Sequence, residues 1–187
     1  MRMQRTSRRI SCAEAGLVVV DIQERLLPSI HERERVLRNA IRLAKGAGVL
    51  NLPILVTEQY PKGIGRTVAE LAGAVPEFAP LEKTAFSCCG ARNFNSTLAS
   101  RNVRDVVLCG IEAHVCVSQT ALDLLDQGIG VFVAADAISS RTPENRQHGI
   151  ERMRDAGATI VSAEMILFEL LEDAGTDQFK KILELIK

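Results

Sequence analysis

The sequence lacks the features that would assign it to a specialised class of protein. It has no tryptophan and one tyrosine among 187 residues, and its 23 basic residues are balanced by 23 acidic ones. A formal net charge of zero gives no electrostatic reason to bind a nucleic acid or a membrane surface. No apolar run approaches the ~20 residues that span a bilayer. We therefore expect neither nucleic acid nor a membrane as a partner, and a near-neutral chain is compatible with self-association.

Metal and nucleotide motifs are also missing. The chain has three histidines, far apart in sequence, and no CxxC pair. The segment EQYPKGIG, which follows the second apolar run, offers Glu58 as its one carboxylate and contains no histidine. GIGRT matches neither the GxGxxG nor the Walker phosphate loop. The sequence therefore predicts no metal site and no cofactor, and it disfavours a dinucleotide site.

The five cysteines are an odd number, and two of them, Cys88 and Cys89, are adjacent. A vicinal pair is a poor long-range cross-link, so free thiols in a reducing compartment are expected. This favours a cytoplasmic location.

The N-terminal segment MRMQRTSRRISCAEAG is basic, with no acidic residue before Glu14. It has no apolar core of the kind that signal peptides contain. We interpret residues 1–16 as a short basic arm, with organelle targeting as the open alternative, and residues 17–187 as a single domain, because a domain typically takes ~100–200 residues.

Apolar, β-branched runs alternate with helical patterns along the chain. Runs without polar alternation are typical of strands buried on both faces, and strands that alternate with helices predict a parallel sheet. The predicted strands are Leu17–Val20, Ile54–Thr57, Val106–Cys109, Gly130–Ala134 and Thr159–Val161. The predicted helices are Arg33–Lys45, Thr67–Leu71, Asn95–Ser100, Val115–Gln127, Thr142–Ala156 and Gln178–Ile186. Gly46 and Gly48 are expected to end the first helix, Asn93 or Asn95 to cap the third, and Tyr60–Arg66 to form a mobile loop.

Two charged residues stand where ligands bind in open α/β folds. Asp21 directly follows the apolar run LVVV, which places it at the carboxyl edge of the predicted sheet. From this local pattern alone, it is equally plausible that Asp21 caps the following segment, QERLLPSI, by accepting hydrogen bonds from its backbone N–H groups. Lys83 lies between apolar Leu81 and Phe86, and a partly buried lysine must keep an anionic partner or lose its proton. Most lysines, however, are simply solvated.

Cys116 is the candidate nucleophile. It falls just after a strand-to-helix connection, in the first turn of a predicted helix, where the partial positive charge of the helix terminus lowers the pKa of a thiol. From composition alone, a buried structural cysteine is the commoner interpretation. His114 is two residues away, and neighbours at that spacing usually point apart, so His114 is not expected to be the base.

Together these residues resemble the isochorismatase-like cysteine hydrolase superfamily. Three segments carry the resemblance, in the expected order: LVVVDIQERL, LEKTAFSCC, and LCGIEAHVCVSQTALDLLDQG followed by VFVAADAISSR. The match runs from about Leu17 to Leu171 and is nearest to the uncharacterised isochorismatase-domain hydrolases.

The resemblance implies a three-layer α/β/α sandwich with a six-stranded parallel sheet, Rossmann-like in form. It implies a triad of Asp21, Lys83 and Cys116. It also implies a non-proline cis peptide between Ile111 and Glu112, which turns the Glu112 N–H toward the Cys116 N–H as an oxyanion hole. A pocket for a small-molecule substrate is expected to be lined by Gln23, Gln59, Tyr60 and Phe86, and homo-oligomers are expected.

The implied activity is hydrolysis of a small amide-like or imine-like C–N bond through a covalent thioester-type intermediate, without a metal. The sequence departs from nicotinamidases, because the Asp/His metal set after the second strand is missing. True isochorismatases do not depend on this cysteine. The alternatives are a weakly active or inactive relative that acts as an interaction or regulatory protein, or a thiol redox sensor that uses Cys88, Cys89 or Cys116.

Overall fold

Six apolar strands form one parallel sheet in the computed structural model, which describes residues 9–187. The strand order is β3-β2-β1-β4-β5-β6, and every neighbouring pair is parallel. The strands are β1 Ala15–Val20, β2 Ile54–Gln59, β3 Leu81–Lys83, β4 Asp105–Ile111, β5 Gly130–Ser139 and β6 Thr159–Val161.

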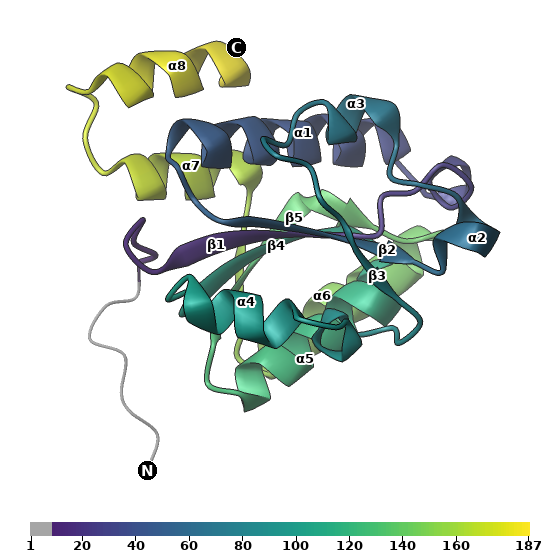
Figure 1. Cartoon of the computed structure of the whole chain (residues 1–187). Coiled ribbons are helices and arrows are strands. Elements are labelled where there is room, and N and C mark those ends of the chain that lie inside the picture. The colour runs from purple at the N-terminus through teal and green to yellow at the C-terminus, as the bar shows by residue number, and fades with distance from the viewer. Residues whose placement is uncertain (1–8) are drawn as a thin grey trace.

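Helices cover both faces of this sheet, as Figure 1 shows. Helices α1, α3, α7 and α8 lie on one side, and α4, α5 and α6 lie on the other. Their bounds are α1 Arg33–Val49, α2 Pro61–Ile64, α3 Ala69–Ala72, α4 Phe94–Ser100, α5 Ser118–Asp126, α6 Pro143–Asp155, α7 Ala163–Leu171 and α8 Asp177–Ile186. The three-layer, six-stranded α/β/α fold predicted from the sequence is therefore confirmed.

Two apolar clusters fill the space between the layers. One includes Leu17, Val56 and Ile166, between the sheet and the layer of α1 and α7. The other includes Val18 and Leu108, on the side of α4, α5 and α6. Because neighbouring residues of one strand, such as Leu17 and Val18, face opposite clusters, the central strands carry runs of consecutive apolar residues rather than alternating ones.

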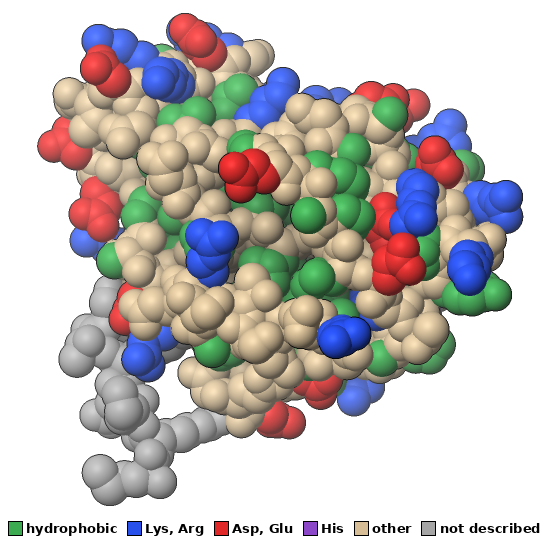
Figure 2. Space-filling model, in the orientation of Figure 1, with side chains coloured by type: hydrophobic (Ala, Val, Ile, Leu, Met, Phe, Trp, Pro, Cys, Tyr) green, Lys and Arg blue, Asp and Glu red, His purple; other side chains and the backbone are tan. Residues whose placement is uncertain are grey.

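The surface matches the balanced composition. On the face shown in Figure 2, acidic and basic side chains are interspersed. Within residues 9–187, no helix combines the length and the apolar character that crossing a bilayer demands. The start of the expected basic arm, residues 1–8, lies outside the described residues, whereas Ile10 packs in the core at 2% exposure.

The first helix does not end where its glycines predicted. α1 continues through Gly46 and Gly48 to Val49. A Cβ built on Gly46 would lie 2.4 Å from Cδ2 of Leu167. The glycine thus allows α7 to pack closely on α1, and the prediction that it stops the helix was wrong.

Several other local predictions also needed correction. β3 and α7 were not predicted: β3 has three residues, and α7 is apolar on most of its surface, so it carries no clear helical period. Asn93 occupies the cap position of α4, but its side chain makes no capping hydrogen bond. The expected mobile loop Tyr60–Arg66 contains the short helix α2.

The chain order of the strands creates a switch point between β1 and β4. From β1 the chain adds β2 and β3 outward on one side, and then crosses back to β4, β5 and β6 on the other. In open α/β sheets, ligands bind in the crevice at the carboxyl ends of the two strands where the order reverses. The residues that follow β1 and β4 are therefore the natural place for a site.

Gly149 allows α6 to press against the turn that follows β4. A Cβ built on Gly149 would lie 2.7 Å from the carbonyl oxygen of Ala113 and 3.0 Å from the backbone nitrogen of His114. Both contacts are to backbone, which cannot rotate away. The position of the Ala113–Val117 turn therefore depends on the missing side chain.

We predict that Gly149→Ala destabilises the protein, although an alanine in a helix interior normally adds about 1 kcal/mol of stability relative to glycine. Overpacking of this kind costs about 1–3 kcal/mol. Urea unfolding measures the change. Arg154→Ala, an exposed position on the same helix, is the control and should change the free energy of unfolding by less than about 0.5 kcal/mol. A more stable Gly149→Ala protein would contradict the packing argument.

Candidate active site

A buried ion pair lies at the switch point. Lys83 Nζ donates to Asp21 Oδ2 at 2.7 Å, and both side chains are 0% exposed. Asp21 directly follows β1 and takes a left-handed backbone conformation, with φ 51°. Lys83 is the last residue of β3, two strands away. The sheet topology thus brings together two residues that are far apart in the sequence.

The ammonium of Lys83 is fully bonded. Besides Asp21, Nζ donates to Gln59 Oε1 at 2.7 Å, to the Phe86 carbonyl at 2.9 Å and to the Ala85 carbonyl at 3.2 Å. An ammonium has three hydrogens, so these acceptors use all of its donor capacity. Lys83 can therefore act through its charge and position without donating a hydrogen bond to a ligand.

Cys116 joins the pair from the other side of the switch point. It lies in the π-helical turn Ala113–Val117, between β4 and α5, and is 6% exposed. Its thiol lies close enough to Asp21 for the carboxylate to raise the pKa of the thiol. The structure thus places the three residues of the predicted triad in one buried cluster at the carboxyl edge of the sheet.

The environment of Cys116 opposes ionisation. Burial, followed by the negative charge of Asp21, raises the pKa of the thiol to about 12, and the nearby charge of Lys83 lowers it only in part. The expectation of a thiol activated by a helix N-terminus was therefore wrong in direction. The reason is that Cys116 is buried, which opposes the charged form, and that it lies in the turn before α5 beside a carboxylate whose negative charge also raises the pKa of the thiol.

The peptide bond between Ile111 and Glu112 is cis. It lies between β4 and the turn that carries Cys116. The Glu112 carboxylate points to Arg141 and accepts from its Nε at 2.7 Å. The side chain of Glu112 is thus engaged in an ion pair.

The four expected pocket residues divide into two kinds. Gln23 and Gln59 are buried and bonded within the protein: Gln23 Oε1 accepts from the Gln59 N–H at 2.7 Å, and Gln23 Nε2 donates to the Gln59 and Gly65 carbonyls at 3.0 and 2.6 Å. Tyr60 and Phe86 are 53% and 54% exposed. The two amides are thus bonded within the protein beside Lys83, whereas the side chains of Tyr60 and Phe86 are half exposed and the ring of Tyr60 lies against Gly63.

The structure also places Thr57, Cys88 and Thr120 around the triad. Thr57 Oγ1 donates to Asp21 Oδ1 at 2.8 Å and lies 3.5 Å from Cys88 Sγ. Thr120 Oγ1 accepts from the Cys88 N–H at 2.9 Å and donates to the Cys116 carbonyl at 2.7 Å. Sequence reasoning missed all three roles. For Thr57, the available signal was a hydroxyl at the end of the predicted strand Ile54–Thr57, whose other residues are apolar.

His114 does not join the triad in the structure. Its Nδ1 lies 2.9 Å from Ser140 Oγ. Glu58, the carboxylate considered for a metal, accepts from the Thr67 N–H and Oγ1 at 2.8 and 2.9 Å and from Arg66 Nη1 at 2.9 Å. Within residues 9–187, no group of three or more His, Cys, Asp or Glu side chains is arranged to hold a metal ion.

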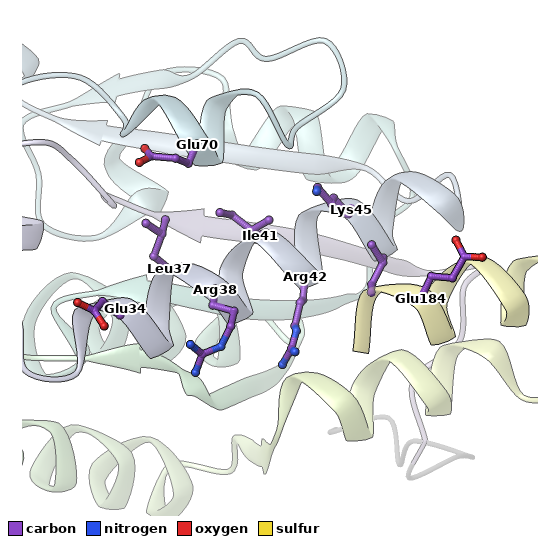
Figure 3. Close-up of a pocket in the computed structure, with 9 residues that line it drawn as sticks. Glu34, Leu37, Arg38, Ile41, Arg42, Lys45, Glu70 and Glu184 are labelled. Carbon is purple, nitrogen blue, oxygen red and sulfur yellow. The ribbon is translucent and has the colours of Figure 1, made fainter. Parts of the chain in front are cut away.

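A groove of about 480 Å³ lies elsewhere, between α1, α3 and α8 (Figure 3). Leu37 and Ile41 of α1 lie along it, with Glu70 of α3 and Glu184 of α8 on either side. No residue of the triad lines it. This groove is therefore separate from the candidate active site.

Comparison with known proteins gives consistent results. The Isochorismatase domain family matches residues 15–165. Isochorismatase domain-containing protein 2 of Homo sapiens is 41% identical over 180 residues, which cover 96% of this chain and 86% of that protein.

Two solved structures have the same fold. One, titled MAR1 ribonuclease from Caenorhabditis elegans, has a TM-score of 0.91 and 38% identity, covering 95% of this chain and 92% of that one. The other, the YcaC gene product of Escherichia coli, is described as an octameric hydrolase of unknown specificity. It has a TM-score of 0.90 and 23% identity, covering 97% of this chain and 92% of that one. At that identity, YcaC supports the fold alone.

We predict that Asp21→Asn makes Cys116 more reactive toward iodoacetamide. The charge of Asp21 and its hydrogen bond both raise the pKa of the thiol, and the variant removes the charge while Lys83 stays. A neighbouring charge shifts a pKa by about 1–3 units, so the rate at pH 8 should rise at least about tenfold. Mass spectrometry of the Cys116 peptide measures it.

Lys83→Met should have the opposite effect and slow the labelling, because it removes the positive charge that lowers the pKa of Cys116. Asp123→Asn, at an exposed position of α5, is the control and should match the wild type. Circular dichroism establishes that each variant is folded. Unchanged or slower labelling of folded Asp21→Asn would show that the carboxylate does not hold the thiol proton.

Proposed function

Because the chain belongs to the isochorismatase-like superfamily, we propose that it is a cysteine hydrolase that cleaves a small amide-like or imine-like C–N bond. The observation that carries this proposal is the buried Cys116 thiol beside the Asp21 carboxylate, which raises the pKa of the thiol and is itself paired with buried Lys83. A nucleophile, a base within hydrogen-bond reach and a third group that orients the base are the parts that covalent catalysis requires.

The thiol enters the reaction protonated. Since its pKa is raised to about 12, a standing thiolate is rare at neutral pH, and the S–H proton must move to Asp21 as sulfur attacks the substrate carbon. The new C–S bond forms while the π electrons of the C=O or C=N bond move to its heteroatom. The positive charge of Lys83 stays beside the reacting groups throughout.

The leaving amine takes the proton back. The tetrahedral intermediate collapses, the C–N bond breaks, and Asp21 returns its proton to the departing nitrogen. A water molecule then attacks the thioester and gives its proton to Asp21. As the C–S bond breaks, Asp21 passes this proton to the leaving sulfur, which restores the thiol and the carboxylate. In this scheme the Glu112 and Cys116 N–H groups form the oxyanion hole that stabilises both intermediates.

We propose that this chemistry proceeds without a metal. The argument rests on the donor set: Glu58, the carboxylate in the segment after β2, is already bonded to Thr67 and Arg66. We propose that the half-exposed side chains of Tyr60 and Phe86 contact the substrate. The cysteines among the described residues are free thiols, which agrees with the proposed cytoplasmic location.

We predict that a panel of small amides and ureides, assayed by ammonia release, contains a substrate, and that Cys116→Ala lowers its turnover at least about 10³-fold. Cys12→Ala is the matched control. Cys12 lies near α7, where its thiol donates to the Leu170 carbonyl, so its removal should leave turnover unchanged. Full turnover by Cys116→Ala would contradict the mechanism.

Single-stranded RNA belongs in the same panel, because one similar structure is titled a ribonuclease. RNA cleavage that Cys116→Ala abolishes would overturn the proposed C–N substrate class. Reversible peroxide-dependent oxidation of Cys116 without any turnover would favour the thiol redox sensor instead. No turnover and no oxidation would favour an interaction or regulatory protein.

We also propose that the protein is a homo-oligomer. The proposal rests on two large apolar side chains, Met165 and Phe168, that are exposed on α7. Light scattering at micromolar concentration should give a mass that is a multiple of the 20.4 kDa chain. A single 20.4 kDa species would contradict this prediction.

A further inference from the structure

Thr57 contacts the candidate base directly. Its hydroxyl lies 2.8 Å from Asp21 Oδ1, and Thr57 is 0% exposed. Lys83 binds the other carboxylate oxygen, Oδ2, at 2.7 Å. Each oxygen of Asp21 therefore has its own donor, and the two donors come from different strands, β2 and β3. This arrangement fixes the plane of the carboxylate.

The direction of the hydrogen bond follows from the available protons. An ionised carboxylate only accepts, so the single hydrogen of the Thr57 hydroxyl goes to Asp21. In the 3.5 Å contact between Thr57 Oγ1 and Cys88 Sγ, the thiol must then be the donor. Burial raises the pKa of Cys88 to about 11, which keeps that proton on sulfur at neutral pH.

Resting on the function proposed above, we infer that Thr57 is a positioning residue for Asp21: its hydroxyl holds the carboxylate in the orientation that exchanges a proton with Cys116 and shares its negative charge. Within the described residues, the charged and titratable groups that face Asp21 are Lys83 from β3, Cys88 from the turn after β3, and Cys116 from the turn after β4. To these groups Thr57 adds a hydroxyl, which donates to Asp21 and does not titrate.

The physical effect of the hydroxyl can be stated. A carboxylate with two strong donors spreads its charge over both of them, which weakens its hold on a third proton. Without the Thr57 hydroxyl, the Asp21 carboxylate keeps more of its negative charge and interacts more strongly with Lys83 and with the Cys116 S–H. The thiol proton is then held more tightly, and the thiolate becomes harder to form.

The test uses Thr57→Val, which keeps the shape of the side chain and removes its donor. The readout is the rate at which Cys116 reacts with iodoacetamide from pH 7 to 10, followed on the Cys116 peptide by mass spectrometry. We expect the profile to move to higher pH by about half to one unit, which corresponds to labelling about three- to tenfold slower at a given pH. Thr57→Ser should restore the wild-type profile.

This direction separates a positioning role from a structural one. If Thr57 only filled space, its replacement would loosen the packing around a thiol that is 6% exposed, and labelling would become faster. Thr159→Val, at an exposed position on β6, controls for the substitution itself and should leave the profile unchanged. If Thr57→Val does not fold, Thr57→Cys retains a weak donor and should give an intermediate shift.

An unchanged or faster profile for folded Thr57→Val, or a Thr57→Ser protein as slow as the valine variant, would overturn the inference. These outcomes leave the proposed function standing, because that depends on turnover and its loss in Cys116→Ala. Conversely, full turnover in Cys116→Ala would overturn the proposed function whatever the behaviour of the Thr57 variants.

Discussion

The candidate site depends on the buried pair of Lys83 and Asp21. Two unscreened charges in an apolar interior are tolerated when each finds its partner and further hydrogen bonds, because desolvation otherwise outweighs their attraction. Here the ammonium has Asp21, Gln59 and two carbonyls, and the carboxylate has Lys83 and Thr57. Removing one partner of such a pair costs about 3–5 kcal/mol. The sheet order β3-β2-β1 therefore has to be complete before the site can exist.

Burial and the carboxylate of the pair together explain why the nucleophile is held as a thiol, because the charge of Lys83 opposes them only in part. Asp21 lies beside Cys116 as a negative charge and an acceptor, so it raises the pKa of the thiol that it would deprotonate. The protein therefore does not have to stabilise a thiolate before the substrate binds. The S–H proton moves to Asp21 only when a substrate carbon is present to form the C–S bond. A protonated resting nucleophile is also less open to oxidation than a standing thiolate, because susceptibility follows thiolate character.

Much of the fold could be predicted because its central strands carry runs of consecutive apolar residues, and their order along the chain allows few topologies. Asp21 and Cys116 could be singled out because each follows a predicted strand, and Lys83 because it lies between apolar residues in a segment that resembles the family. Other features depend on tertiary contacts that the sequence does not display. Gly46 resembles a helix stop until α7 packs against it, and α7 itself has no polar face to give it a period. From the sequence alone, the π-helical turn that carries Cys116 cannot be distinguished from the first turn of α5.

The pKa of Cys116 was the prediction that local reasoning got wrong, and the error shows what such reasoning leaves out. A helix N-terminus acts on a thiol only as strongly as its distance and exposure allow. Burial and the negative charge of the Asp21 carboxylate both act in the opposite direction, and Asp21 is far away in the sequence. The same holds for Thr57, whose hydroxyl has no assigned partner until β1 and β2 pair in the register that sets Val20 beside it and Asp21 one residue beyond. The chemistry of this site is therefore a property of the sheet register as much as of the residues themselves.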